Sequence, residues 1–315
     1  MAHKKIVIRN EQSVDVEAIA PVIVSASRAT DIPAFYADWF FNRLDKGYLA
    51  WRNPFNGKDS YVSFANTRFV VFWSKNPKPL IPYLPILKDK GIGFYIQFTL
   101  NDYDAEQLEP GVSRLAERID TFKRIVDEYG LGSVVWRFDP LILTDKISQE
   151  LLLHRISAIA ELLNGFTEKL VFSFADIADY RSVARNLRAM GVNYREWNTE
   201  DMVTFARLLA DIRLPFRLAT CAEAIDLEEF GIEHNRCIDP ELISRRSPDD
   251  AELQTFLQRA KPDSGQRKLC GCILSKDIGA YNTCPHLCRY CYANYLPQKV
   301  TQNFRKHTIC SESII

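Results

Sequence analysis

Residues 134–140 read Val134-Val135-Trp136-Arg137-Phe138-Asp139-Pro140, an apolar run of strand length that ends in charged residues and a proline. Runs of this kind recur along the chain, at residues 22–26, 69–73, 94–99, 134–138, 170–174 and 216–219. Most of them lack polar alternation, which is typical of strands buried on both faces of a parallel sheet. The recurrence of these runs decides the fold class.

Amphipathic helical patterns lie between the runs, at residues 115–129, 151–163 and 202–212, the last behind an N-cap signal that begins at Asn198. Repeated strand–helix units favour parallel strands joined by right-handed crossovers. We therefore expect an α/β fold in which residues 1–225 form a TIM-like β/α barrel, complete or partial. An open doubly wound sheet has the same periodicity and is the alternative. Asn53-Pro54 and Asn56-Gly57 predict a β-hairpin insertion near residues 48–64.

Charged side chains follow nearly every predicted strand: Arg28, Lys75, Arg137, Asp139, Asp176 and Glu223. In a barrel these positions converge on one mouth, where barrel enzymes place their chemistry. We predict catalytic roles for Lys75, Arg137, Asp139 and Glu223, which would orient a cofactor or substrate. Arg28, Asp31 and Arg137 are the predicted cofactor-binding residues. The alternative for each is a helix cap or a salt bridge at the barrel rim.

The remaining segment, residues 226–315, is predicted to be a C-terminal extension that carries a metal site. Its central string is Cys284-Pro-His-Leu-Cys288-Arg-Tyr-Cys291. Three thiolates from one short loop suit a 4Fe–4S cluster that keeps one iron free of protein ligands. Zinc is the alternative, because Cys270, Cys272 and His286 lie nearby in the sequence.

Five further cysteines lie outside this string. Cys237, Cys270 and Cys272 are candidates for a fourth ligand or for a second cluster. Cys221 reads instead as a small buried hydrophobe, and Cys310 as a free thiol.

The cysteine string resembles the cluster motif of the radical S-adenosylmethionine (SAM) enzymes, including the aromatic Tyr290 before the third cysteine. Residues 283–294 are similar to the branch around spore photoproduct lyase. Taken whole, the chain resembles an uncharacterised bacterial domain-of-unknown-function family over about residues 20–297. The matching segments are Ser25-Ala-Ser-Arg-Ala-Thr-Asp-Ile-Pro33, Phe72-Trp-Ser-Lys-Asn-Pro77, Trp136-Arg-Phe-Asp-Pro140 and residues 270–294.

This resemblance implies a radical SAM-like enzyme that binds SAM, although the cysteine block follows the last predicted strand instead of preceding the first. The rival interpretation is a non-catalytic binding barrel with a structural zinc or iron–sulfur site. The likeness to a photoproduct lyase allows a nucleic-acid substrate, but 40 basic and 40 acidic residues cancel and give it no electrostatic support. The expected partners are a small-molecule cofactor and a substrate that the sequence does not identify.

The composition is that of a globular protein, since 47% of the 315 residues are hydrophobic. No apolar run approaches the ~20 residues that span a bilayer, and the first residues lack a secretion signal. We therefore expect a cytoplasmic protein with reduced cysteines and no membrane partner.

Overall fold

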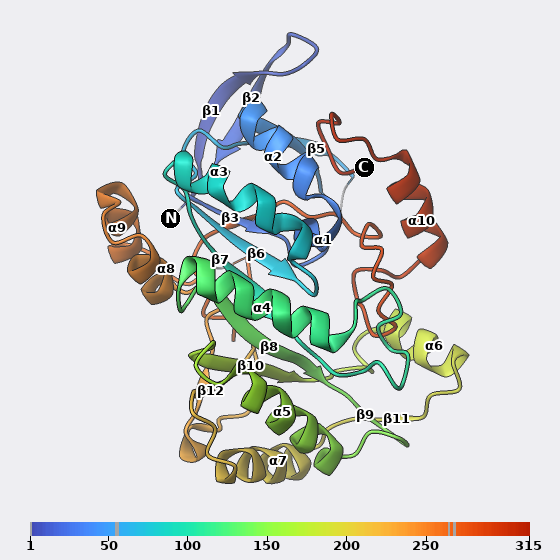
Figure 1. Ribbon diagram of the computed structural model, residues 1–315. Helices are drawn as coiled ribbons and strands as arrows, with labels where there is room; N and C mark the ends of the chain where they lie inside the picture. Colours follow the sequence, from blue (N-terminus) through green and yellow to red (C-terminus); the bar gives the residue numbers. More distant parts are fainter. Residues whose placement is uncertain (1, 54–56, 264, 267–268) are drawn as a thin grey trace.

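A parallel sheet forms the centre of the computed structural model, which describes residues 2–53, 57–263, 265–266 and 269–315 (Figure 1). Its strands are β3 (Ile23–Ala26), β6 (Phe69–Ser74), β7 (Gly93–Thr99), β8 (Val134–Leu141), β10 (Lys169–Phe174), β12 (Arg217–Thr220), β13 (Ile232–His234) and β14 (Lys276–Asp277). The first six coincide with the six apolar runs of the sequence. The prediction of these strands is therefore confirmed.

Neighbouring strands follow the chain order from β3 to β13, β14 pairs with β3, and every pairing is parallel. The expected α/β class is confirmed, and this is the strand order of a barrel opened between its last two strands. Within the described residues no ladder joins β13 to β14. One backbone–backbone hydrogen bond, from Ile273 N to Ile238 O at 3.3 Å, links the segments beside them. We call this line between β13 and β14 the seam.

Helices and short 3₁₀ turns connect the strands. They are α1 (Ile32–Phe35), α2 (Ala37–Lys46), η1 (Lys78–Tyr83), α3 (Leu84–Asp89), α4 (Leu115–Tyr129), α5 (Gln149–Leu163), α6 (Arg181–Ala189), α7 (Thr199–Asp211), η2 (Glu228–Phe230), α8 (Pro240–Arg246), α9 (Ala251–Gln258) and α10 (Pro297–Lys306). Helices α4, α5 and α7 confirm the three predicted amphipathic segments, and Asn198 caps α7 by accepting a hydrogen bond from Asp201 N. In the described part of the chain, no helix has the length and apolar character that crossing a membrane requires.

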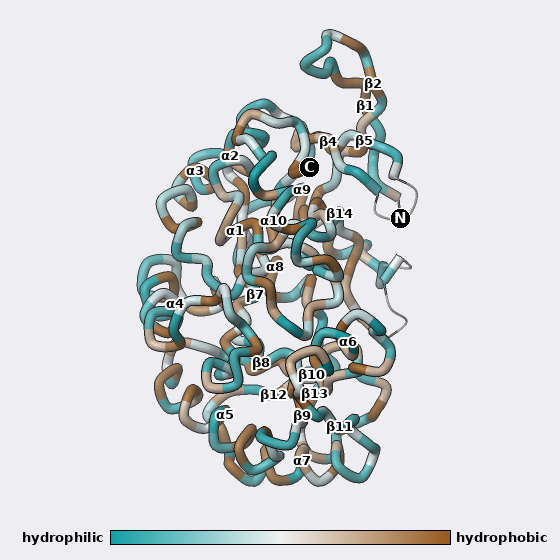
Figure 2. The backbone as a smooth tube through the Cα atoms, turned by 90° about the vertical axis from the view of Figure 1, so that its right-hand side faces the viewer, coloured by the Kyte–Doolittle hydropathy of each residue, from teal (hydrophilic) through white to brown (hydrophobic). Residues whose placement is uncertain are grey.

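A second, four-stranded sheet lies beside the first and consists of β1 (Lys4–Arg9), β2 (Asp15–Ala20), β4 (Tyr48–Arg52) and β5 (Asp59–Ser63). The predicted hairpin insertion is confirmed, since β4 pairs antiparallel with β5. Residues 54–56 of its predicted turns lie outside the described residues. The β1–β2 hairpin projects from the body of the molecule (Figure 2). Two short strands, β9 (Leu143–Thr144) and β11 (Tyr194–Arg195), pair separately.

Side chains alternate between the two faces of the central sheet, as the pleat requires. Val70, Phe72 and Trp136 pack into one apolar cluster with the covering helices. Phe69, Val71, Tyr95, Val135 and Val171 point to the opposite, inner face and pack with Cys237, Ile238, Cys272 and Ile273. By the same alternation, Trp73, Gln97, Arg137, Asp139 and Ser173 belong to the inner face. Polar groups therefore stand above an apolar floor at the carboxyl ends of the strands.

Candidate functional site

A cavity of about 360 Å³ opens above that floor, a volume within the range of small-molecule sites. All six charged strand-end residues singled out in the sequence line it, and so does Asp31. Ligand sites of parallel α/β sheets lie at this end of the strands. The convergence predicted from the strand ends is therefore present in the structure.

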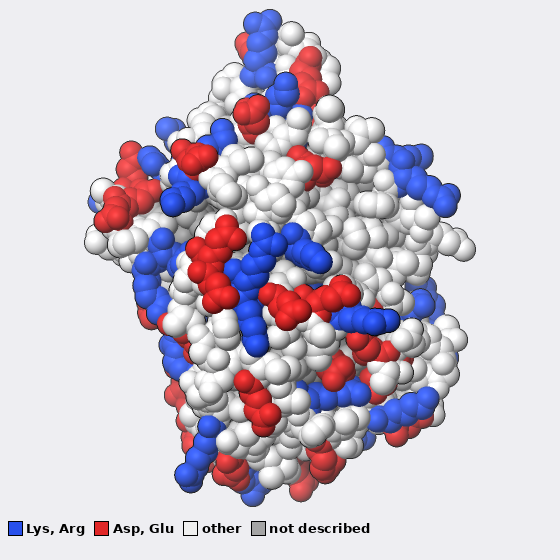
Figure 3. All heavy atoms as spheres, viewed as in Figure 1, with Lys and Arg blue, Asp and Glu red and all other residues white. Residues whose placement is uncertain are grey.

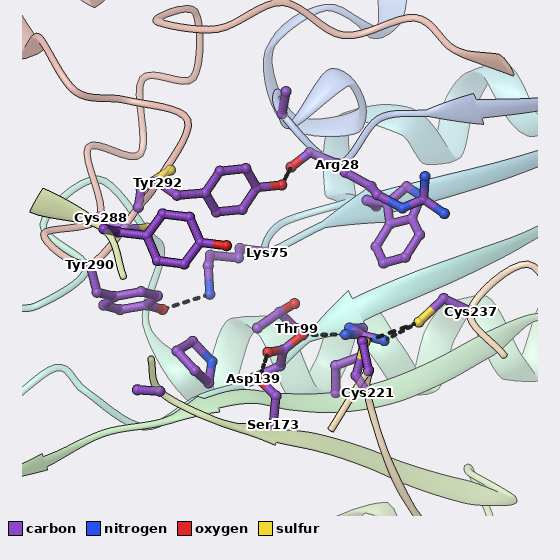
Figure 4. A pocket seen from close by; sticks show the side chains of 18 of the residues that line it. Arg28, Lys75, Thr99, Asp139, Ser173, Cys221, Cys237, Cys288, Tyr290 and Tyr292 are labelled. Carbon is purple, nitrogen blue, oxygen red and sulfur yellow. Dashed lines mark hydrogen bonds and ion pairs between the residues drawn. The ribbon is translucent and has the colours of Figure 1, made fainter. Parts of the chain in front are cut away.

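The cysteine loop, residues 284–291, forms one side of this cavity through Cys284, Cys288 and Cys291. Figure 4 shows Cys288 at the cavity. It follows β14, which pairs with β3, so the loop meets the residues that follow the first strands. Its position after the last strand thus brings it to the same mouth.

Two backbone contacts dock the cysteine loop on the segment after β7. Gly111 N donates to His286 O at 3.0 Å, and Arg289 N donates to Leu108 O at 2.9 Å. A Cβ atom on Gly111 would lie 2.6 Å from Pro285 O and 2.7 Å from His286 O. Only glycine permits this close approach without a backbone shift.

A buried polar network fixes the middle of the loop. Lys75 Nζ donates to Glu109 Oε1 at 2.7 Å and to Tyr290 Oη at 2.9 Å, and Tyr290 also donates to Glu109. Asn101 Nδ2 completes the network with a 3.0 Å contact to Tyr290 Oη. Burial opposes the charge of Lys75, but Glu109 and Cys288 outweigh it and raise the lysine's pKa. Lys75 is therefore a cation held beside a cysteine of the loop.

Cys288 is buried, Cys284 and Cys291 are half-buried, and the surroundings of all three loop thiols disfavour their charged form. Burial raises the pKa of Cys284, Cys288 and Cys291, and Lys75 only partly opposes this at Cys288. Thiolates, not thiols, bind metals, so a bound metal would have to supply the compensating charge. Across the described chain, no three His, Cys, Asp or Glu side chains already have the arrangement of a metal site.

Arg137 stands on the inner face of β8 with its guanidinium engaged on two sides. Nη2 pairs with Asp139, and Nη1 donates to Cys237 Sγ at 3.1 Å. Asp139 also accepts from Ser173 Oγ. Burial alone would raise the pKa of Asp139, but Arg137 and Ser173 hold it below its ordinary value. Arg137 and Asp139 thus form an ion pair in the cavity wall.

Asp139, Asp176 and Glu223 give the cavity a wall of carboxylates. Burial raises the pKa of Glu223 to about 8; Asp176 and Asp139 add to the rise, against the hydrogen bond that Phe174 N donates to Glu223 at 2.9 Å. Mutual repulsion of this kind is relieved when a cation binds. The wall is therefore suited to a positively charged ligand group.

The predicted cofactor residues after β3 have structural partners. Asp31 caps α1 through Ala34 N, accepts from Ser74 Oγ and Lys75 N, and lies 2.8 Å from His286 Nε2. The Asp31 carboxylate therefore joins the segments that follow β3, β6 and β14 at the mouth of the cavity. Arg28 stacks on Trp73 at 5.0 Å from the ring centroid, and its Nη2 is buried without a hydrogen-bond partner among the described residues.

The six predicted metal ligands fall into two groups. Cys284, Cys288 and Cys291 lie in the cysteine loop, whereas Cys237 and Cys272 pack together with Cys221 and Cys270 on the inner face. Figure 4 shows Cys288 and the pair Cys221 and Cys237 on opposite sides of the cavity. Cys310 is exposed.

Sequence reasoning missed Glu109, the buried acceptor for Lys75 and Tyr290. It lies in a loop where no periodic pattern marks it, and only its place before Pro110-Gly111 hints at a fixed turn. Cys221 was interpreted as a small buried hydrophobe, because a lone buried cysteine usually serves only for packing. In the structure its Sγ contacts that of Cys237, 16 positions further along the chain.

The model of one protein family, described as a domain of unknown function (DUF1848), matches residues 23–293. Because the match spans most of the chain, the chain belongs to this family. No relative of the chain is found among curated proteins.

Proposed function

We propose that this member of the DUF1848 family is an iron–sulfur enzyme similar to radical SAM enzymes. In this proposal Cys284, Cys288 and Cys291 hold a 4Fe–4S cluster at the cavity. One observation carries it: three thiols of a single loop line the same cavity as a wall of carboxylates. Figure 4 shows Cys288 and Tyr290 across the cavity from Asp139 and Ser173.

The number and type of the donor atoms in the cysteine loop fit such a cluster. Three thiols are available, and no fourth cysteine belongs to the loop, so one iron would remain open to a small molecule. Lys75, beside Cys288, would offset part of the negative charge that thiolate ligands bring. When bound, such a cluster supplies one electron for reductive cleavage of SAM and thereby a radical that abstracts hydrogen.

The protein's own residues would bind and orient the ligand. SAM carries an ammonium and a sulfonium, and Asp139, Asp176 and Glu223 offer the opposite charge. The raised pKa of Glu223 supports this role, because a neighbouring cation would stabilise its ionised form. The Lys75–Glu109–Tyr290 network would hold the loop rigid against this wall.

We further propose that the substrate is a small molecule. The cavity has the volume of a small-molecule site, and the chain has no net charge. On the face shown in Figure 3, basic and acidic side chains are interspersed. Such a face does not provide the continuous positive surface on which nucleic-acid binding depends.

The test is anaerobic purification followed by iron, sulfide and zinc analysis, with electron paramagnetic resonance of the reduced protein with and without SAM. We expect about four iron and four sulfide per chain and a signal that SAM changes. Replacing Cys284, Cys288 and Cys291 with Ala should abolish the iron, while Cys310→Ser should retain it. Iron-free protein that holds only zinc in this loop would favour the structural-metal alternative and refute the proposal.

A further inference from the structure

Four cysteines that the proposed function does not use bracket the seam of the central sheet. Cys221 directly follows β12, and Cys237 follows β13. Cys270 and Cys272 lie shortly before β14, on the other side of the seam. These segments are far apart in sequence, yet the fold brings all four thiols into one apolar cluster.

Two of the sulfur atoms are in direct contact, since Cys221 Sγ lies 3.4 Å from Cys237 Sγ. Cys270 and Cys272 pack in the same cluster. Cys237 and Cys272 are buried, Cys221 and Cys270 are half-buried, and all but Cys272 line the cavity. A closed set of four cysteines is the usual composition of a structural zinc site.

Hydrogen-bond donors surround two of these sulfurs. Asn235 Nδ2 and Arg137 Nη1 each donate to Cys237 Sγ at 3.1 Å, and Ile238 N donates to Cys272 Sγ at 3.2 Å. A neutral thiol is a weak acceptor, whereas a thiolate is stabilised by such donors. These donors would stabilise Cys237 and Cys272 as thiolates once a metal ion displaces their protons.

One positively charged side chain contacts one of the four cysteines, and a second lies in the same cavity wall. Besides Arg137, the cavity wall holds Arg28, which stacks on Trp73. Its buried Nη2 has no hydrogen-bond partner in the described residues. An unpaired buried guanidinium nitrogen is costly, and a negatively charged site beside it would remove that cost.

The spacing favours one metal ion over a cuboidal cluster. Tetrahedral zinc with Zn–S bonds of about 2.3 Å places its sulfurs about 3.8 Å apart, close to the 3.4 Å between Cys221 and Cys237. A cuboidal cluster separates its thiolates more widely, because each binds a different iron atom. Since no three such side chains in the described chain are already arranged as a metal site, binding requires the thiols to rotate into a tetrahedron.

We propose that Cys221, Cys237, Cys270 and Cys272 bind one zinc ion that clips the β12–β13 side of the sheet to β14. Four thiols would lose four protons, and the resulting site with Zn²⁺ would carry a charge of −2. The guanidinium group of Arg137 lies next to it, 3.1 Å from Cys237 Sγ. The clip would replace the backbone ladder missing across the seam, where Ile273 N donates to Ile238 O and Ile238 N donates to Cys272 Sγ. It would close the sheet as a TIM-like barrel.

The experiment starts from the Cys284/Cys288/Cys291→Ala triple variant, so that the cysteine loop cannot contribute metal. Zinc is measured in the purified protein, and Co²⁺ is then titrated into metal-free protein to observe the absorption of a tetrahedral thiolate site. We expect one zinc per chain and the cobalt spectrum of four sulfur ligands. Adding Cys270→Ser, a change at a half-buried ligand, should weaken zinc binding by about 100-fold or more, since even outer-shell changes cost 10–100-fold. Adding Cys310→Ser is the matched control and should change nothing.

Several outcomes would overturn the proposal. The triple variant could contain no zinc and give no cobalt spectrum, or it could hold iron and sulfide in these four cysteines. Zinc affinity that is unaffected by Cys270→Ser would also exclude the site. A Cys221–Cys237 disulfide in protein isolated without air, shown by a loss of two hydrogens in the intact mass, would replace the metal site by a redox pair. Because the background lacks the loop cysteines, none of these results depends on the proposed enzyme activity.

Discussion

His286 Nε2 lies 2.8 Å from Asp31 Oδ2, and this contact joins the cysteine loop to the residue that caps α1. The other ring nitrogen, Nδ1, lies 2.9 Å from Gly111 O. Both ring nitrogens therefore have an oxygen atom within hydrogen-bond distance. His286 thus acts as a bridge between the segments that follow β3 and β7.

His286→Ala should destabilise the protein by about 1.5–3 kcal/mol, the range for a hydrogen bond to a charged group. Asp31 would remain buried with one partner fewer. Urea unfolding at neutral pH measures the change. The exposed His154, on α5, provides the control, and His154→Ala should stay within about 0.5 kcal/mol of the unmodified protein. Equal effects of the two substitutions would remove the bridging role.

Gly111→Ala should displace the cysteine loop, because the added methyl group would meet backbone atoms of Pro285 and His286 at 2.6–2.8 Å. Overpacking of this kind costs about 1–3 kcal/mol. The expected result is a lower iron content after anaerobic loading, together with a lower melting temperature. Val112→Ala alters the neighbouring half-buried residue without adding atoms and should retain the iron. Full iron loading of Gly111→Ala would show that the loop docks elsewhere.

The strands and the convergence of their charged ends could be predicted from the sequence, because buried parallel strands leave long apolar runs and the polar residue after each run stands out. Arg137 and Asp139 are an example, since a spacing of two places both on one face. The partnership of Glu109 with Tyr290 could not be predicted. It joins a loop after β7 to a loop after β14, and neither has a periodic pattern. The place of Cys221 in the second cysteine group could not be predicted either, because only the strand order brings Cys221 beside Cys237.

Arg137→Ala should destabilise the protein by about 3 kcal/mol or more, because it would leave Asp139 without its cation in the cavity wall. This effect is expected without any bound ligand. Denaturant unfolding measures it, with Arg124→Ala as the control, since Arg124 is exposed on α4. A loss below about 1 kcal/mol would mean that water or Ser173 alone satisfies Asp139.

Glu223 should make the stability of the protein depend on pH. Its pKa is about 8 in the folded protein and about 4.3 when unfolded, so the folded state binds more protons between these values. The free energy of unfolding should therefore fall as pH rises through this window and level off above pH 8. Glu223→Gln imitates the protonated side chain and should remove that part of the fall.

Melting temperatures at pH 5.5 and pH 9 measure this difference, and Glu161→Gln, at an exposed position on α5, is the control. The Glu223→Gln protein should lose less stability between the two pH values than either the unmodified protein or the control. Parallel pH profiles would show that Glu223 is ionised in the folded state at neutral pH.

The last prediction is that the central sheet folds without metal in the cysteine loop. The apolar clusters on its two faces are built from strands and helices, and none of their buried members is a loop cysteine. Burial of apolar surface supplies most folding free energy, so the Cys284/Cys288/Cys291→Ala protein should unfold in one cooperative transition. Its loop should also stay docked, since the Lys75–Glu109–Tyr290 network and the Gly111 contact involve no thiol. Differential scanning calorimetry and limited proteolysis measure both properties. A variant without a cooperative transition would make the loop metal a structural element, and the non-catalytic interpretation would then be favoured.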